Sequence, residues 1–148
     1  MRQITVTILN RPREFENIAR LLKEAGVNIL AFHLADTESG GFVQVVCDKH
    51  EVALSALRGD YKMFTRESEI LAVSAPHVPG QLARILSMLG NLHVSVRSSY
   101  MSMDPRNKPV VLLEFFGSEN VRTAKESLGA CPDLSIVDTL EGQYGTES

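Results

Sequence analysis

The sequence of 148 residues contains no tryptophan, only two cysteines and no long apolar run. Cys47 and Cys131 are too few for a disulfide scaffold, and neither belongs to a CxxC pair of the kind that holds zinc. No segment approaches the roughly 20 apolar residues of a membrane helix, and the N-terminus lacks the pattern of a signal peptide. We therefore expect a cytoplasmic protein with reduced thiols, no membrane segment and no metal centre.

Positive charge is also scarce. Lys and Arg number 15 against 18 Asp and Glu, so the net charge is -3, and the sequence pI is about 5.8. The basic residues are scattered, with no run of three. Because a basic patch is the usual footprint of a nucleic-acid-binding protein, direct binding to nucleic acid is not expected. The hydrophobic content of 44% is ordinary for a globular protein with a buried core.

The most informative feature is an internal repeat. A shift of 67 positions places Pro12 on Pro79 and Leu22 on Leu89. A unit of this length is too long for a solenoid repeat and favours two copies of one small domain. The predicted boundaries are residues 1–67 for domain 1, 68–140 for domain 2 and 141–148 for a polar C-terminal tail.

In both copies, segments with the apolar spacing of a strand and segments with that of a helix follow one another in the same order. In copy one, alternation in QITVTIL predicts a strand, and Phe15, Ile18 and Leu22 predict an amphipathic helix that ends at Gly26. The predicted strands are 3–9, 27–36, 42–48, 60–66, 69–75, 93–103, 110–116 and 133–140, and the predicted helices are 13–26, 49–59, 80–89 and 118–129. The order βαββαβ occurs twice, which is the ferredoxin-like arrangement of an antiparallel sheet with two helices on one face. The predicted fold class is therefore α+β, and two such copies can join edge to edge or pack their bare sheet faces.

The stretch HVPGQL places Pro79 and Gly80 between a strand and a helix. The first backbone N–H groups of a helix lack partners and carry partial positive charge. Gly80 lets the backbone turn tightly and leaves room for a small anion, such as the carboxylate of an amino acid. A plain loop connector is the other interpretation, because Pro and Gly are common in loops.

Two stretches resemble the signature of the ACT domain family. They are ILNRPREFENIARLLKEAGVNILAF in copy one and APHVPGQLARILSMLGNLHVSV in copy two, and each combines a strand, a Pro-containing loop, an amphipathic helix and the opening of a further strand. Copy one is especially similar to the regulatory ACT domain of phosphoglycerate dehydrogenase. The resemblance covers about residues 2–140. It implies a stand-alone pair of ACT domains that binds a small ligand, usually an amino acid, between two ACT units, often side by side in one eight-stranded sheet.

The resemblance also implies which residues bind the ligand. An Asn before the Pro-Gly pair and the Asn of a Gly-x-Asn-Ile segment carry over to Asn10 and Asn28, and the matching positions of copy two are His77 and Ser95. An amide suits this task because it offers both an acceptor and donors. The candidate ligand-binding residues are Asn10, Arg11, Pro12, Arg13, Asn28, Ile29, His77, Val78, Pro79, Gly80, Gln81, Leu82 and Ser95.

Copy one departs from the family pattern at two positions. Arg13 stands in place of the Gly, and Ile8 stands in place of a His. The Arg13 guanidinium could pair with a carboxylate or be a solvated surface charge, and we favour the second interpretation. Under pseudo-twofold symmetry, one cleft combines the copy-one loop with the start of the second strand of copy two. The other cleft combines residues 77–82 with residues 28–29, and we favour it because Gly80 makes the better anion cradle.

No Ser-His-Asp arrangement, phosphate-binding loop or metal-ligand cluster is evident, so we expect a non-catalytic module without a cofactor. A sensor needs an output, which predicts a homodimer or a partner enzyme or regulator. Two alternatives stay open: a co-regulator or scaffold of metabolism or transcription without its own ligand, and a small enzyme that uses His77. SGGFVQVV faintly resembles an RNA-binding motif, but the acidic pI and the lack of paired exposed aromatics weigh against RNA.

Overall fold

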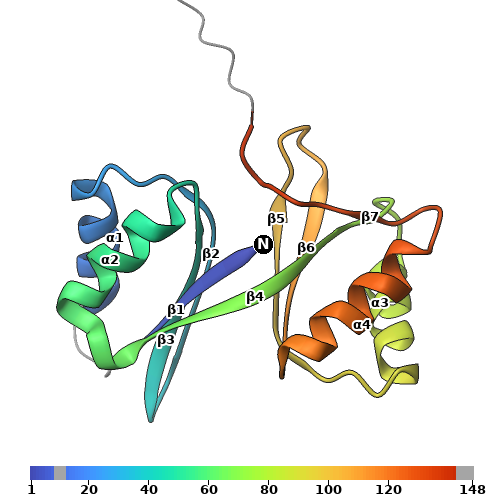
Figure 1. The fold of residues 1–148 in the computed structure, drawn as a ribbon, viewed down its shortest axis with the longest axis horizontal. Helices are drawn as coiled ribbons and strands as arrows, with labels where there is room; N and C mark the ends of the chain where they lie inside the picture. Colours follow the sequence, from blue (N-terminus) through green and yellow to red (C-terminus); the bar gives the residue numbers. More distant parts are fainter. Residues whose placement is uncertain (9–12, 143–148) are drawn as a thin grey trace, which may run out of the picture. The chain divides into compact units, whose positions relative to one another are not determined.

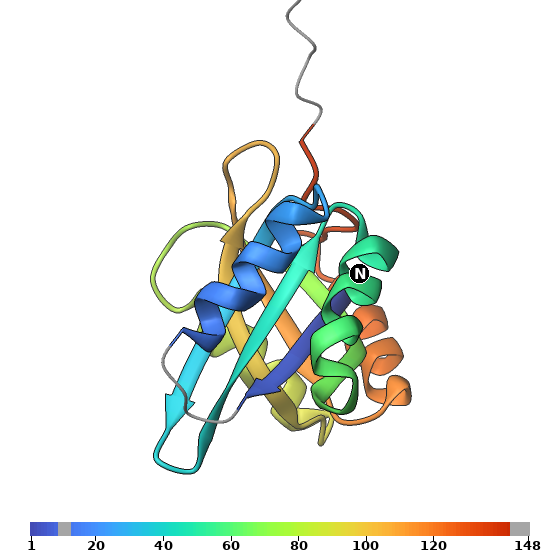
Figure 2. The ribbon, with the colours of Figure 1, turned by 90° about the vertical axis from the view of Figure 1, so that its left-hand side faces the viewer.

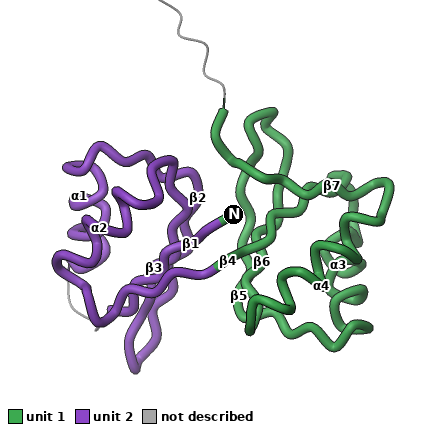
Figure 3. The backbone as a smooth tube through the Cα atoms, viewed as in Figure 1, with its two compact units in different colours: residues 1, 69–148 green, residues 2–68 purple. Residues whose placement is uncertain are grey.

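The computed structural model describes residues 1–8 and 13–142 and confirms the α+β class, with ferredoxin-like order in each copy (Figure 1). The chain divides into two compact units (Figure 3). We call Arg2–Ser68 the N-terminal unit, and Met1 together with Glu69–Ser148 the C-terminal unit. Within the described ranges, no helix combines the length and the apolar character needed to cross a membrane.

In the N-terminal unit both helices cover one face of the sheet (Figure 2). The elements are β1 (Arg2–Ile8), α1 (Glu14–Glu24), β2 (Ile29–Thr37), β3 (Gly40–Cys47), α2 (His50–Tyr61), the short 3-10 helix η1 (Lys62–Phe64) and the first part of β4 (Thr65–Ser74). The strand order is β2-β3-β1-β4. The core forms because Ile4 and Val6 alternate along β1 and pack against Ile18 and Leu22, one turn apart on α1.

The C-terminal unit repeats this design. It contains the second part of β4, then α3 (Gln81–Asn91), β5 (Val96–Met103), β6 (Pro109–Phe115), α4 (Ser118–Gly129) and β7 (Ser135–Ile136). The strand order is β5-β6-β4, with β7 on the other side of β4. Ile85 and Leu89 of α3 occupy the repeat positions of Ile18 and Leu22, and they are equally buried in the core of this unit.

The described residues contain seven strands rather than the eight predicted. The predicted strand 60–66 is wrong over residues 60–64, which are helical, and only its last two residues belong to a strand. Those two residues continue into the predicted strand 69–75 as one strand, β4, because residues 66–68 contain no Gly or Pro that would break it. Gly59 was predicted to end a helix, but it lies inside α2, and the chain continues helically to Phe64. Gly26, by contrast, has φ 67° directly after α1, as expected of a glycine that ends a helix.

Candidate ligand-binding site

The start of α3 has no side-chain cap. Its N-cap residue Gly80 has φ 92°, and the first turn of α3 contains no acidic residue. The N–H of Arg84 donates to the carbonyl of Gly80 at 3.0 Å, so the N–H groups of residues 81–83 precede the first intrahelical bond. This helix start therefore presents backbone donors and partial positive charge that no acidic side chain of its own first turn offsets.

The left-handed conformation explains why a glycine occupies position 80. A Cβ atom built on Gly80 would meet no heavy atom within 4 Å, so crowding is not the reason. A residue with a side chain pays an energetic penalty at this φ, whereas glycine does not. The prediction that Gly80 serves a tight backbone turn is confirmed.

A cavity of about 180 Å³ lies beside the start of α3. Five of the predicted site residues line it: His77, Val78, Gly80, Gln81 and Leu82. The remaining lining residues are Ala75, Pro76, Ile85, Met101, Pro109 and Val111. The strand-to-helix loop thus forms one wall of the cavity, and β5 and β6 contribute the other.

Met101, Pro109 and Val111 were missed by the sequence analysis. The sequence could have indicated Met101, because the repeat aligns it with Leu34 and the alternation of side chains along the strand then gives its face. The sequence could not indicate that Val111 lies opposite Met101, because this pairing depends on the register of β5 and β6.

The other predicted site residues are distributed differently. Asn10, Arg11 and Pro12 lie outside the described residues. Pro79 and Ser95 are exposed and do not line the cavity. Arg13 is exposed and is the N-cap of α1, with φ 71°.

Asn28 and Ile29 belong to the N-terminal unit. The backbone N–H of Asn28 donates to Asp48 Oδ1 at 2.9 Å, and its carbonyl accepts from the N–H of Asp48 at 3.1 Å. Ile29 is half-buried at the start of β2. The predicted cleft that joins these two residues with residues 77–82 stays a prediction.

A family model described as an ACT domain pair matches residues 1–138. The chain belongs to the ACT domain pair family. This result confirms the resemblance to ACT domains that the two loop-helix motifs indicated. No curated protein matches the sequence.

Solved structures share the fold of this ACT domain pair. Protein BT0572 from Bacteroides thetaiotaomicron aligns with a TM-score of 0.73 and 19% identity, over 91% of each chain. The ligand-free regulatory subunit of aspartate kinase from Thermus thermophilus aligns with a TM-score of 0.63 and 13% identity, over 85% of this chain and 89% of that chain. The more specific resemblance of copy one to phosphoglycerate dehydrogenase stays a prediction.

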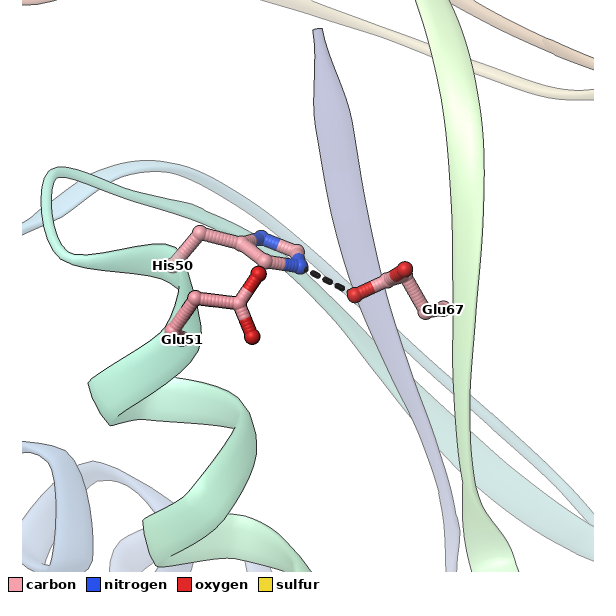
Figure 4. A group of neighbouring side chains, drawn as sticks. All are labelled: His50, Glu51 and Glu67. Carbon is pink, nitrogen blue, oxygen red and sulfur yellow. Dashed lines mark hydrogen bonds and ion pairs between the residues drawn. The ribbon is translucent and has the colours of Figure 1, made fainter.

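The N-terminal unit of this ACT domain pair also contains a polar cluster that the sequence did not suggest (Figure 4). His50 Nε2 lies 2.6 Å from Glu67 Oε2, and the three potential ligand atoms of His50, Glu51 and Glu67 lie within 4.8 Å of one another. The guanidinium of Arg2 already pairs with both carboxylates, at 2.5 Å from Glu51 and 3.7 Å from Glu67. Because a cation of the chain itself occupies the cluster, we interpret it as an ion-pair network that ties α2 to β1 and β4.

Proposed function

We propose that this ACT domain pair is a non-catalytic regulatory module that binds a free amino acid at the start of α3. The observation that best supports the proposal is that a helix start without a side-chain cap lies beside a cavity. The chain also belongs to a family of regulatory domains. The carboxylate accepts hydrogen bonds from the N–H groups of the first turn of α3. The neutral amide of Gln81, whose oxygen accepts from Arg84 Nη1 at 3.5 Å, places no negative charge beside the bound carboxylate.

The start of α1 is less suited to the same ligand. Its first turn contains Glu14 and Glu16, which place negative charge where a carboxylate would bind. The Tyr61 hydroxyl donates to Glu14 Oε2 at 2.6 Å and accepts from Asn17 Nδ2 at 2.8 Å. Burial, together with the Glu14 hydrogen bond, raises the pKa of Tyr61 against the opposing effect of Asn17, so the phenol stays a donor. This network holds the Glu14 carboxylate beside the helix.

The regulatory output follows from linkage. A ligand shifts the protein toward the conformation or assembly that it binds more tightly, and by no more than that difference in affinity. The ACT resemblance implies that a second ACT domain completes the site. Because a sensor needs an output, we also propose that the protein acts in the cytoplasm as a homodimer or on a partner enzyme or regulator. We propose ACT domains over residues 1–67 and 68–140, which leaves residues 141–148 as a tail.

A thermal-shift screen against the twenty amino acids at millimolar concentration tests the proposal. A ligand at 100 times its dissociation constant adds about 2.7 kcal/mol, which raises Tm by roughly 2–4 °C per kcal/mol for a chain of this size. Leu82→Glu should abolish the shift, because it puts a carboxylate into the cavity wall at the helix start. Leu86→Glu is the matched control, since Leu86 is similarly exposed one turn later and does not line the cavity. A screen in which no amino acid raises Tm would contradict the proposal and favour the scaffold alternative.

A further inference from the structure

The side chains around the cavity beside α3 are mostly apolar. Val78, Leu82, Met101 and Val111 line it together with Ile85 and Pro109, and His77 and Gln81 are the polar exceptions. None of the described lining residues is Asp, Glu, Lys or Arg. A charged group that entered the cavity would give up hydration without meeting an opposite charge in its walls.

Exposure separates the floor of the cavity from its rim. Ile85 and Val111 are 0% and 7% exposed, whereas Leu82 and Met101 are 46% and 59% exposed. The rim therefore presents large apolar side chains to water. An apolar group that covers them is bound favourably, because it removes this apolar surface from water. Met101 adapts readily to such a group because its side chain is unbranched and flexible.

Charged side chains of this region line a different hollow. Lys108 and Asp133 line a neighbouring cavity of about 370 Å³, which shares Ala75, Pro76, His77 and Pro109 with the first. Asp133 is already paired with Arg84, and its second oxygen lies 3.0 Å from Arg84 Nη2. The apolar cavity and the charged hollow thus adjoin at these four residues and differ in the charge of the rest of their lining.

The size of the apolar cavity limits what can enter. About 180 Å³ corresponds to roughly six water molecules at liquid density. This volume accommodates the side chain of one amino acid, and it is smaller than the pockets of about 300–1,000 Å³ that take drug-sized ligands.

We propose that the cavity beside α3 takes the side chain of a hydrophobic amino acid, and that Met101 and Leu82 determine this selectivity. The inference rests on the proposed function, because the helix start binds the α-carboxylate that all amino acids share and the cavity binds the side chain that differs between them. Selection arises because an apolar side chain covers the rim, whereas a charged side chain is desolvated without an opposite charge in the lining, and an amide meets only His77 and Gln81.

Isothermal titration with single amino acids tests the inference on the full chain. Valine, leucine, isoleucine, methionine and phenylalanine form the hydrophobic set, and lysine, aspartate, threonine and glutamine form the polar set. We expect the tightest ligand to be hydrophobic, with an affinity about tenfold or more above that of alanine and a negative heat-capacity change on binding. A polar amino acid as the tightest ligand would overturn the inference and leave the proposed function standing. Binding of no amino acid would overturn both.

A comparison of the variants Met101→Glu and Met103→Glu tests whether Met101 contributes to the selectivity of the cavity. Both residues are exposed on β5, two positions apart, but only Met101 lines the cavity. Met101→Glu should weaken binding of the hydrophobic ligand about tenfold or more, and Met103→Glu should leave it unchanged. Equal losses in the two variants, or a loss confined to Met103→Glu, would overturn the assignment of Met101. Unchanged Tm values of the ligand-free variants would show that both fold.

Discussion

The starts of α1 and α3 occupy equivalent positions of the repeat, and they share a backbone conformation but not a charge. Both N-cap residues are left-handed, with φ 71° at Arg13 and 92° at Gly80. Glu14 follows Arg13, whereas Gln81 follows Gly80. The comparison teaches that the two copies keep the backbone geometry of this helix start but differ in its charge, and we propose that single side chains there decide whether an external anion binds.

The cores of the two units should respond alike to truncation, and this is the largest effect we expect. Leu22 and Leu89 are equivalent in the repeat and are 0% and 1% exposed. Leu22→Ala and Leu89→Ala should each reduce the free energy of unfolding by about 2–5 kcal/mol, because each leaves a cavity in a close-packed core. Urea denaturation measures both values. A loss below about 1 kcal/mol in only one variant would break the equivalence of the two cores.

Substitutions at the two N-cap positions should have opposite signs. Gly80→Ala should destabilise the protein by about 1 kcal/mol, because alanine is strained at positive φ. Arg13→Gly should stabilise it by up to about 1 kcal/mol, because glycine relieves the strain that arginine bears there. Denaturant midpoints distinguish the two outcomes. If Arg13→Gly destabilised the protein, the Arg13 side chain would have a stabilising role that the backbone account omits.

The ion-pair network of the N-terminal unit should give a small pH-dependent effect. The hydrogen bond with His50 is the largest of the causes that lower the pKa of Glu67. A lowered pKa means that the stabilisation is present above the ordinary carboxyl pKa of about 4.3 and is lost as the pH falls through the lowered value. Glu67→Gln should therefore cost about 0.5 kcal/mol or less at pH 7, since solvent reaches the Glu67 end of the pair and screens it, and nothing near pH 2. A difference in Tm between variant and wild type that grows on acidification would contradict this assignment.

The two cysteines, one in each unit, should differ in how fast they react with a thiol reagent. Burial, with a smaller contribution from Asp48, raises the pKa of Cys47 to about 12. Cys131 is half-buried. A thiol reagent at pH 8 should label Cys131 first and Cys47 only when the N-terminal unit opens, because the thiolate is the reactive form. Mass spectrometry of partly labelled protein gives the order, and earlier labelling of Cys47 would contradict the burial argument.

The sequence was sufficient for the parts of the molecule that depend on local patterns. Apolar spacing along residues 80–89 predicted an inward face of Leu82, Ile85, Leu86 and Leu89. Ile85 and Leu89 are buried as predicted, whereas Leu82 and Leu86 are exposed. The Pro-Gly pair predicted the turn at Gly80. The wall from Met101, Pro109 and Val111 depends on strand register, which local alternation does not fix. The merging of two strands into β4 was missed because Gly59 was read as a helix end, although glycine is tolerated inside a helix at modest cost.

The central claim is that the charge at the start of α3, and not the shared fold, makes it the ligand site. Gln81→Glu gives α3 the acidic residue that Glu14 gives α1, and it leaves the backbone unchanged. Titration of this variant with the amino acid identified in the screen tests the claim most directly, with Glu14→Gln as the control. We predict that Gln81→Glu abolishes binding while Tm of the ligand-free protein stays the same or rises slightly, since an acid stabilises a helix start by about 0.3–1 kcal/mol. Undiminished binding in Gln81→Glu, or loss of binding in Glu14→Gln, would contradict the account.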